Sequence, residues 1–134
     1  MKLVVAVIQP TKLAAVHEAL KKIEVTRLTI CDAQAFAAAP PLPIVDRLAP
    51  QSDFSSAGLP SAAMFRGEPC TASLLRKVVL EIIVNDDFLE RTVETILHTA
   101  RTGAEGAFGD GKIFVLPAEQ AIQIDDGLRG PGAV

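Results

Sequence analysis

The sequence GDGKIFVL at residues 109–116 decides the fold, because a glycine-rich turn runs directly into a strand pattern. Glycines let backbone N–H groups approach an anion closely, and Lys112 adds a positive charge. From Gly106 the spacing matches a Walker A phosphate loop as far as this lysine. That motif then requires Ser or Thr and a helix, whereas Ile113 and a strand follow here. We therefore exclude a P-loop and predict an anion-binding turn, with a plain glycine-rich turn as the alternative.

The composition describes a globular chain without signs of a nucleic-acid partner. Its 134 residues suffice for one domain with its own core. No apolar run approaches the length of a membrane span, and the N-terminus reads as a strand rather than a signal peptide. A net charge of −3 and the absence of Trp and Tyr argue against nucleic acid. Cys31 and Cys70 stand far apart, which favours reduced thiols in a cytoplasmic protein.

Hydrophobic periodicity predicts two similar halves, each a strand, a helix and a strand. The first helix is expected to begin at a cap on Thr11. The second is expected to begin at Asp86 or Asp87, with Glu90 completing a capping box. A short element is expected at 118–124. The four predicted strands span residues 2–8, 26–36, 77–84 and 113–116.

Two split β-α-β units predict an α+β, ferredoxin-like sandwich with two helices on one face of an antiparallel sheet. The strands at 2–8 and 77–84 do not alternate cleanly between apolar and polar residues, which indicates burial on both faces. Two helices cover only one face, so we expect further subunits on the other. We treat residues 1–134 as a single domain in which 37–63 form a long insertion and 126–134 a loop-like tail.

Residues 37–63 differ in composition from the rest and hold five of the nine prolines. A segment of this length without secondary structure is either functional or disordered. A short amphipathic turn is expected at residues 44–48 within it. A merely disordered insertion and a role in docking or self-packing are equally open interpretations. The candidate contact residues for a partner are Ile44, Val45, Arg47 and Leu48.

Several segments together resemble the PII signal-transduction proteins, the nitrogen regulatory protein P-II family. The resemblance covers nearly the whole chain outside residues 37–63, and the glycine-rich motif is its most specific part. It implies a cytoplasmic homotrimer that is regulatory and not an enzyme, with an adenine nucleotide (ADP, AMP or ATP) in clefts between subunits. It also implies a long T-loop that docks on a membrane transporter or a metabolic enzyme. The matching segments are residues 1–10, Thr29, 65–67, 85–87, 101–103 and 109–115.

The resemblance assigns roles to individual residues. It implies that the phosphates are met by the glycine-rich turn, namely Gly109, Asp110, Gly111 and Lys112. It implies that the adenine is surrounded by Thr29, Glu81 and Ile83. Lys77 falls where the family has a lysine that binds 2-oxoglutarate, and we interpret it here as a plain strand-end lysine.

Departures from the family pattern change the expected ligand. Ala39 replaces a glutamine that helps to bind Mg²⁺ and 2-oxoglutarate, which argues against both ligands. Gln123 and Asp125 replace two arginines that grip phosphates. The site then has fewer positive charges for a triphosphate, unless Arg101 or Arg129 compensates. We therefore expect either that ADP or AMP is preferred over ATP or that binding of every nucleotide is weak. Ala35, Ala37 and Cys70 replace two glycines and a tyrosine that some members modify covalently.

Three other functions are weighed against this interpretation. A trimer of the related CutA type, binding metal or anions, needs a His/Cys/Asp cluster, whereas His17 and His98 lie on separate helices without a second ligand at helical spacing. We therefore expect no metal site. A small ferredoxin-like enzyme needs a nucleophile–base pair, which no motif supplies. A degenerate scaffold predicts no nucleotide binding at all.

Overall fold

The structure is a computed structural model that describes residues 1–39, 63–65, 68–107 and 109–134. For residues 36–39, 63–65 and 68–74 it describes the backbone alone. The chain divides into two compact units, one formed by Met1–Ala33 with Lys77–Val134 and the other by Gln34–Arg76. The hydrophobic core and the glycine-rich turn both belong to the first unit.

The described strands form one sheet in the order β2-β4-β1-β5, with β3 paired to β4. Strand β1 pairs antiparallel with both β4 and β5, so that Val4 lies opposite Ile82 on one side and Val115 on the other. Since β1 and β2 are joined through a helix but separated in the sheet by β4, the β-α-β unit is split. The predicted α+β, ferredoxin-like fold is confirmed. The strands are β1 Lys2–Ile8, β2 Thr29–Ala39, β3 Ala63–Phe65, β4 Glu68–Val84 and β5 Gly111–Pro117.

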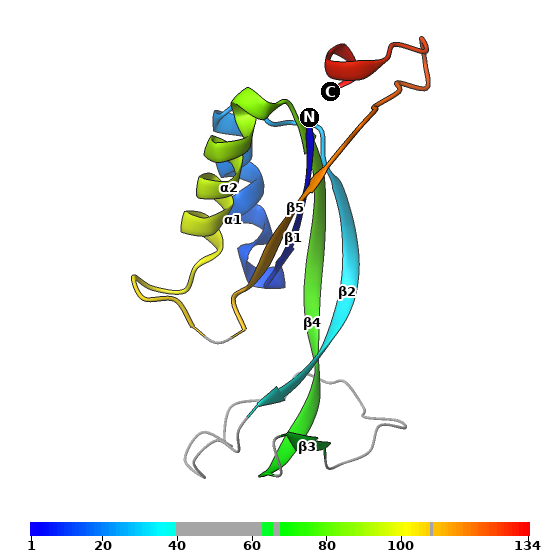
Figure 1. Cartoon of the computed structure of the whole chain (residues 1–134). Coiled ribbons are helices and arrows are strands. Elements are labelled where there is room, and N and C mark those ends of the chain that lie inside the picture. The colour runs from blue at the N-terminus through cyan, green and yellow to red at the C-terminus, as the bar shows by residue number, and fades with distance from the viewer. Residues whose placement is uncertain (40–62, 66–67, 108) are drawn as a thin grey trace. The chain divides into compact units, whose positions relative to one another are not determined.

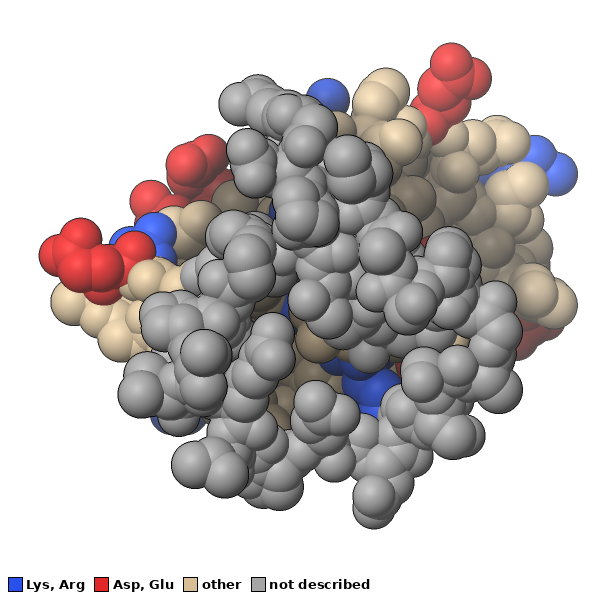
Figure 2. All heavy atoms as spheres, turned by 90° about the horizontal axis from the view of Figure 1, so that it is seen from below, with Lys and Arg blue, Asp and Glu red and all other residues tan. Residues whose placement is uncertain are grey.

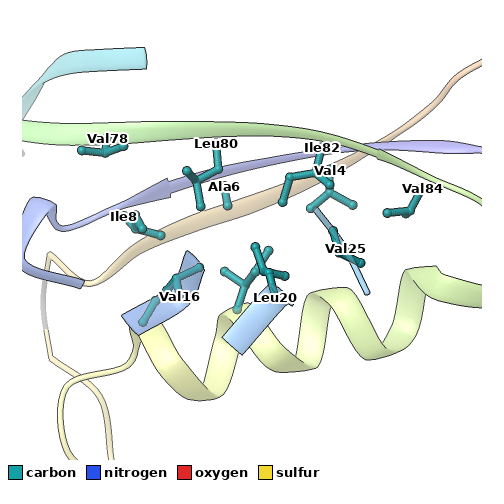
Figure 3. Packing of buried hydrophobic residues seen from close by; sticks show 12 residues of the cluster. Val4, Ala6, Ile8, Val16, Leu20, Val25, Val78, Leu80, Ile82 and Val84 are labelled. Atoms are coloured by element: carbon teal, nitrogen blue, oxygen red, sulfur yellow. The ribbon is translucent and has the colours of Figure 1, made fainter. Parts of the chain in front are cut away.

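Two helices, α1 (Leu13–Lys22) and α2 (Asp86–Ala100), lie on the same face of the sheet (Figure 1). Alternate residues of β1 and β4 point toward them, and the side chains interdigitate with Val16 and Leu20 of α1 (Figure 3). Burying each such aliphatic side chain contributes about 1.5–3 kcal/mol. The most deeply buried members of this core are Val4, Ala6, Val16, Leu20, Ile82 and Ile96, each 0% exposed.

The first helix starts and ends through its backbone rather than through side-chain caps. A 3-10 turn, Pro10–Lys12, precedes it and contains Thr11, so the predicted cap at Thr11 is wrong. At the other end Glu24 has a φ of 66°. The N–H of Glu24 donates to the carbonyl of Lys21, and that of Val25 to the carbonyl of Leu20. These two bonds form a Schellman motif, in which glycine is the usual residue at the left-handed position.

The second helix begins two residues earlier than the predicted capping box of Asp87 and Glu90 requires. Its N-cap is Asn85, whose side chain makes no capping hydrogen bond, so the predicted box of Asp87 and Glu90 is wrong. Asp86 and Asp87 lie in the first turn, where negative charge suits the helix dipole. The amino group of Met1 lies 3.1 Å from Oδ2 of Asp86 and ties the two chain segments together.

Strand ends also differ from the prediction, because backbone pairing continues through residues that break the apolar pattern. Strand β2 extends to Ala39 and β4 begins at Glu68, so both strands reach beyond the predicted limits. The element expected at 118–124 is wrong: an isolated bridge between Ile122 and Arg129 takes its place. Within the tail 126–134, Gly130–Ala133 form a 3-10 helix.

No helix of the described chain covers the second face of the sheet, which we call the open face. Its side chains alternate with those of the core along each strand. On β4 and β5 they remain accessible, with Ile83 37% and Phe114 50% exposed. The open face comprises Leu3, Val5 and Val7 of β1, Val79, Glu81 and Ile83 of β4, and Lys112, Phe114 and Leu116 of β5.

Candidate functional site

The glycine-rich turn closes a loop between the end of α2 and the start of β5. Gly109 and Gly111 have φ angles of 94° and 125°, which side-chain-bearing residues rarely adopt. A Cβ atom at Gly111 would lie 1.8 Å from the carbonyl oxygen of Val7 on the neighbouring strand. The close approach of loop and strand therefore requires glycine at this position, and the strand that follows confirms that the turn is not a Walker loop.

Asp110 holds this loop together through its carboxylate. Its Oδ2 accepts the backbone N–H groups of Thr102 at 2.9 Å and Ala107 at 2.8 Å. Its Oδ1 accepts the Thr102 hydroxyl at 2.6 Å and the side-chain amide of Gln9 at 3.0 Å. The carboxylate thus faces the loop and β1. The loop conformation is set by the chain's own groups, which is a precondition for binding an anion through backbone N–H groups.

The same contacts stabilise the ionised form of Asp110. The hydroxyl of Thr102 is the strongest cause, followed by the N–H groups of Thr102 and Ala107, and together they lower the pKa of Asp110 from 3.8 to about 2. Desolvation opposes this shift, and the charge of Lys12 adds to it. The aspartate is therefore ionised throughout the physiological pH range.

Two lysines contact main-chain carbonyls at either end of the loop. Lys12 Nζ donates to the carbonyl of Arg101 at 3.1 Å, just after α2 ends. Lys77 Nζ donates to the carbonyl of Gly109. Lys77 is 7% exposed and lies within β4, so its interpretation as a plain strand-end lysine is wrong. Sequence reasoning missed the loop-holding contacts of Gln9, Lys12, Lys77 and Thr102.

The sheet register places three of the predicted nucleotide contacts on one surface. Val5 lies between Glu81 and Phe114, and Val7 lies between Val79 and Lys112, so Glu81, Ile83 and Lys112 all belong to the open face. Lys112 is exposed at the end next to the loop, whereas Ile83 lies near the other end of the same strands, opposite Leu3. Thr29 is exposed at the start of β2.

Other features of the described residues point to no further chemistry at the loop. No group of three His, Cys, Asp or Glu side chains is placed to hold a metal ion within the part of the chain that the structure describes. On the face shown in Figure 2, the visible acidic and basic side chains are interspersed, and neither sign forms a patch. The helices described are too short or too polar to cross a membrane. The predicted partner contacts Ile44, Val45, Arg47 and Leu48 lie outside the described residues.

Comparison with known proteins agrees with this geometry. The model of the family described as nitrogen regulatory protein P-II matches residues 55–127. Nitrogen regulatory protein GlnK1 of Methanosarcina mazei is 39% identical over 134 residues, which are 100% of this chain and 97% of that protein. Nitrogen regulatory protein P-II 1 of Escherichia coli is 32% identical, with 100% of both chains covered. The chain belongs to the nitrogen regulatory protein P-II family.

Gln123 and Asp125 stand where the resemblance implies phosphate-binding arginines, and here they belong to a small group of hydrogen-bonded polar side chains. Nε2 of Gln123 donates to Oδ2 of Asp125 at 3.0 Å, and Nη1 of Arg27 donates to Oε1 of Gln123 at 3.5 Å. Arg27 therefore brings a guanidinium to this segment, and Asp125 brings an opposite charge. Arg101 and Arg129 were considered as substitutes for the missing arginines, but neither makes a described contact with Gln123 or Asp125 through its side chain. Arg101 donates to the carbonyl of Ala104 at 3.5 Å within its own loop, and Arg129 pairs through its backbone with Ile122.

A cavity of about 220 Å³ lies at the junction of α1–β2 and β4–α2 in this PII chain. Ile83 lines it together with Phe88, and the C-terminal Val134 reaches the same cavity. Asn85 also lines it and donates Nδ2 to the carbonyl of Pro131 at 3.3 Å, while its buried Oδ1 has no hydrogen-bond partner among the described residues. Of the predicted nucleotide contacts, Ile83 alone borders this cavity, so the cavity and the glycine-rich loop are separate features.

Proposed function

We propose that this PII-family chain is a cytoplasmic regulator that forms a homotrimer and binds an adenine nucleotide, ADP or AMP in preference to ATP, in clefts between subunits. Through the segment 37–63 it controls a partner, either a membrane transporter or a metabolic enzyme. The proposal rests first on one observation: the loop carrying Gly109–Lys112 is held in place by the hydrogen bonds of Asp110 to Thr102 and Ala107. Lys112 stands exposed beside it.

The open face supports the assignment to subunit clefts. Its apolar residues Leu3, Val5 and Phe114 surround the polar residues Glu81 and Lys112, which the resemblance assigns to nucleotide contacts. In soluble proteins, a large exposed apolar sheet face usually marks a surface that binds another protein chain. Most soluble oligomers consist of copies of one chain, so further copies of this chain are the simplest partners for the open face. A nucleotide held at the edge of such an interface would meet residues from two subunits.

The charge of the site supports the preference for fewer phosphates. ATP carries about four negative charges, and hydrogen bonds between charged groups are the strong ones. Each such bond is worth about 1.5–3 kcal/mol, or roughly a tenfold to hundredfold change in affinity. Gln123 and Asp125 replace two guanidiniums, and Arg27 replaces at most one of them. The loss of binding affinity that these two replacements cause therefore grows with each additional phosphate of the nucleotide.

Calorimetric titration with AMP, ADP and ATP, with and without Mg²⁺ and 2-oxoglutarate, tests this function. We expect ADP or AMP to bind at least tenfold more tightly than ATP. In the double variant Gln123→Arg/Asp125→Arg, affinity for ATP should rise at least about tenfold. The matched control is Glu119→Arg, which adds the same charge as Asp125→Arg at an exposed position of the same segment.

Tight ATP binding that is enhanced by Mg²⁺ and 2-oxoglutarate would overturn the preference for ADP or AMP. Absence of binding by all three nucleotides would instead support the scaffold alternative. An equal gain from Glu119→Arg would show that the added charge acts at long range and not within the site.

A further inference from the structure

We infer that Lys77 is a positioning residue: its buried ammonium holds the carbonyl of Gly109 and so keeps the glycine-rich loop ready for an anion. The inference deepens the proposed nucleotide site and rests on it for its ligand. Its structural part concerns the ligand-free chain alone, and it stands or falls independently of which nucleotide binds.

Lys77 lies in the cross-strand row just beyond the end of β1, next to the glycine-rich loop, although β4 itself continues past it. The last described pairs join Ile8 to Val78 on β4 and to Gly111 on β5. One step further, the antiparallel register brings Gln9 level with Lys77 and Asp110. The hydrogen bond of 3.0 Å between Gln9 and Asp110 agrees with this placement.

The burial of Lys77 is unexpected for its position. It shares the strand alternation of Glu81 and Ile83, which are both exposed on the open face. Lys77 is nevertheless 7% exposed, and its Nζ bonds to the loop carbonyl at Gly109. A buried ammonium requires acceptors, because leaving it without a hydrogen bond is costly. The loop supplies the acceptor, and the lysine in return fixes the loop against β4.

The bond acts on the residue whose conformation matters for anion binding. Gly109 has a φ of 94°, and a Cβ atom at this position would lie 3.9 Å from Nζ of Lys77. Asp110 fixes the loop from one side through Thr102 and Ala107, and Lys77 fixes it from the strand. Without Lys77, the loop populates other conformations, and the apparent affinity of any ligand that uses it falls by the fraction that remains competent.

Hydrogen exchange of the loop amides in the ligand-free protein, combined with nucleotide titration, tests this role. Lys77→Met keeps the length of the side chain and removes its donor. We expect exchange at residues 109–111 to accelerate about tenfold or more, and the affinities for AMP, ADP and ATP to fall by similar factors. Lys77→Arg retains a donor and should recover at least part of the protection.

Two control variants separate positioning from direct contact. Lys112→Met should leave exchange in the ligand-free loop unchanged, and its effect on affinity should increase with the number of phosphates. Lys12→Met removes the other hydrogen bond between a lysine and a loop carbonyl. The exchange rates at residues 109–111 should then stay within about twofold of the wild-type rates. Unchanged exchange in Lys77→Met, or equal acceleration in Lys12→Met, would overturn the inference. Absence of nucleotide binding by the wild type would refute the proposed function without affecting this result.

Discussion

At the scale of single residues, Asp110 has a structural role that differs from the phosphate contact that the resemblance assigns to it. The resemblance assigns its position to phosphate contacts, yet its carboxylate accepts hydrogen bonds from Thr102 and Ala107 inside the loop. A carboxylate directed at a phosphate would repel it, whereas a carboxylate turned into the loop leaves the outward-facing groups to meet the ligand. The negative charge is thereby separated from the expected anion.

The depressed pKa of Asp110 makes loop stability depend on acid pH. The pKa is lowered from 3.8 to about 2, chiefly by the hydroxyl of Thr102. A carboxylate with a lowered pKa contributes stability that is complete above its unfolded value and is lost as the pH falls through the folded value. We therefore expect the free energy of unfolding of the wild type to decrease more steeply between about pH 4 and pH 2 than that of Asp110→Asn.

Urea unfolding at a series of pH values measures this difference. Thr102→Val, which removes the strongest cause of the pKa shift, should show an intermediate pH dependence. At neutral pH, Asp110→Asn should be the less stable protein, because an amide nitrogen would face N–H donors. Parallel pH profiles for wild type and Asp110→Asn would contradict the assignment of the loop's acid sensitivity to this carboxylate.

At the scale of elements, the start of β5 depends on a glycine that no other residue can replace. A Cβ atom at Gly111 would overlap the carbonyl oxygen of Val7 at 1.8 Å, and the φ of 125° adds strain. Gly111→Ala should therefore destabilise the chain by more than about 3 kcal/mol or prevent β1 and β5 from pairing. Gly103→Ala is the matched control, because Gly103 has a φ of 63° and a Cβ atom added there would meet no other atom within 4 Å.

Chemical denaturation of the two variants separates strain from overlap. Gly103→Ala carries the conformational penalty alone and should cost about 1–2 kcal/mol. If both variants lose the same stability, the backbone conformation explains the effect and the contact with Val7 does not.

The elements were predictable where burial determines the pattern. Apolar runs of strand length located β1 and the last part of β4, and helical spacing located α1 and α2, since their inward residues, such as Val4 and Leu20, form the core. The end of α1 was not predictable, because it is closed by backbone bonds at Glu24 where no glycine marks it. The full length of β4 was hidden for a similar reason: strand pairing continues through residues without an apolar pattern.

The candidate site was predictable in position but not in its internal contacts. The glycine spacing and the resemblance located the loop, since glycines at 109 and 111 are required by the backbone itself. The partners of Asp110 lie up to 101 residues away in sequence, as with Gln9, and only the folded sheet brings them together. An aspartate between two glycines with Thr102 at the start of the same loop was the available signal for a structural carboxylate. Lys77 was noted through the resemblance alone, and nothing in the sequence indicated its contact with the carbonyl of Gly109.

At the scale of the whole molecule, the open face remains without a cover in the described chain. Phe114 and Leu116 are 50% and 44% exposed on β5, beside the half-buried Val5 of β1. The hydrophobic effect favours removing such a surface from water, by about 25 cal/mol for each Å² of apolar area. Both helices already cover the opposite face, so under the proposed function this stabilisation comes from further copies of the chain.

Replacing one aromatic residue on the open face should therefore dissociate the proposed trimer. In Phe114→Asp each subunit would bury one unpaired carboxylate in the interface. Because the interfaces of a closed symmetric trimer are equivalent, the cost of desolvating this charge applies at every one of them. Sedimentation equilibrium should then show the mass falling to about one third, with the circular dichroism of the fold retained.

Leu97→Asp is the matched control, because Leu97 is 43% exposed on α2, away from the open face. A Phe114→Asp protein with wild-type mass, or an equal loss of mass in Leu97→Asp, would mean that the subunits associate through another surface. The proposed adenine-nucleotide cleft would then have to be sought there, because the open face presents Glu81, Ile83 and Lys112 to a neighbouring subunit only if it is the interface.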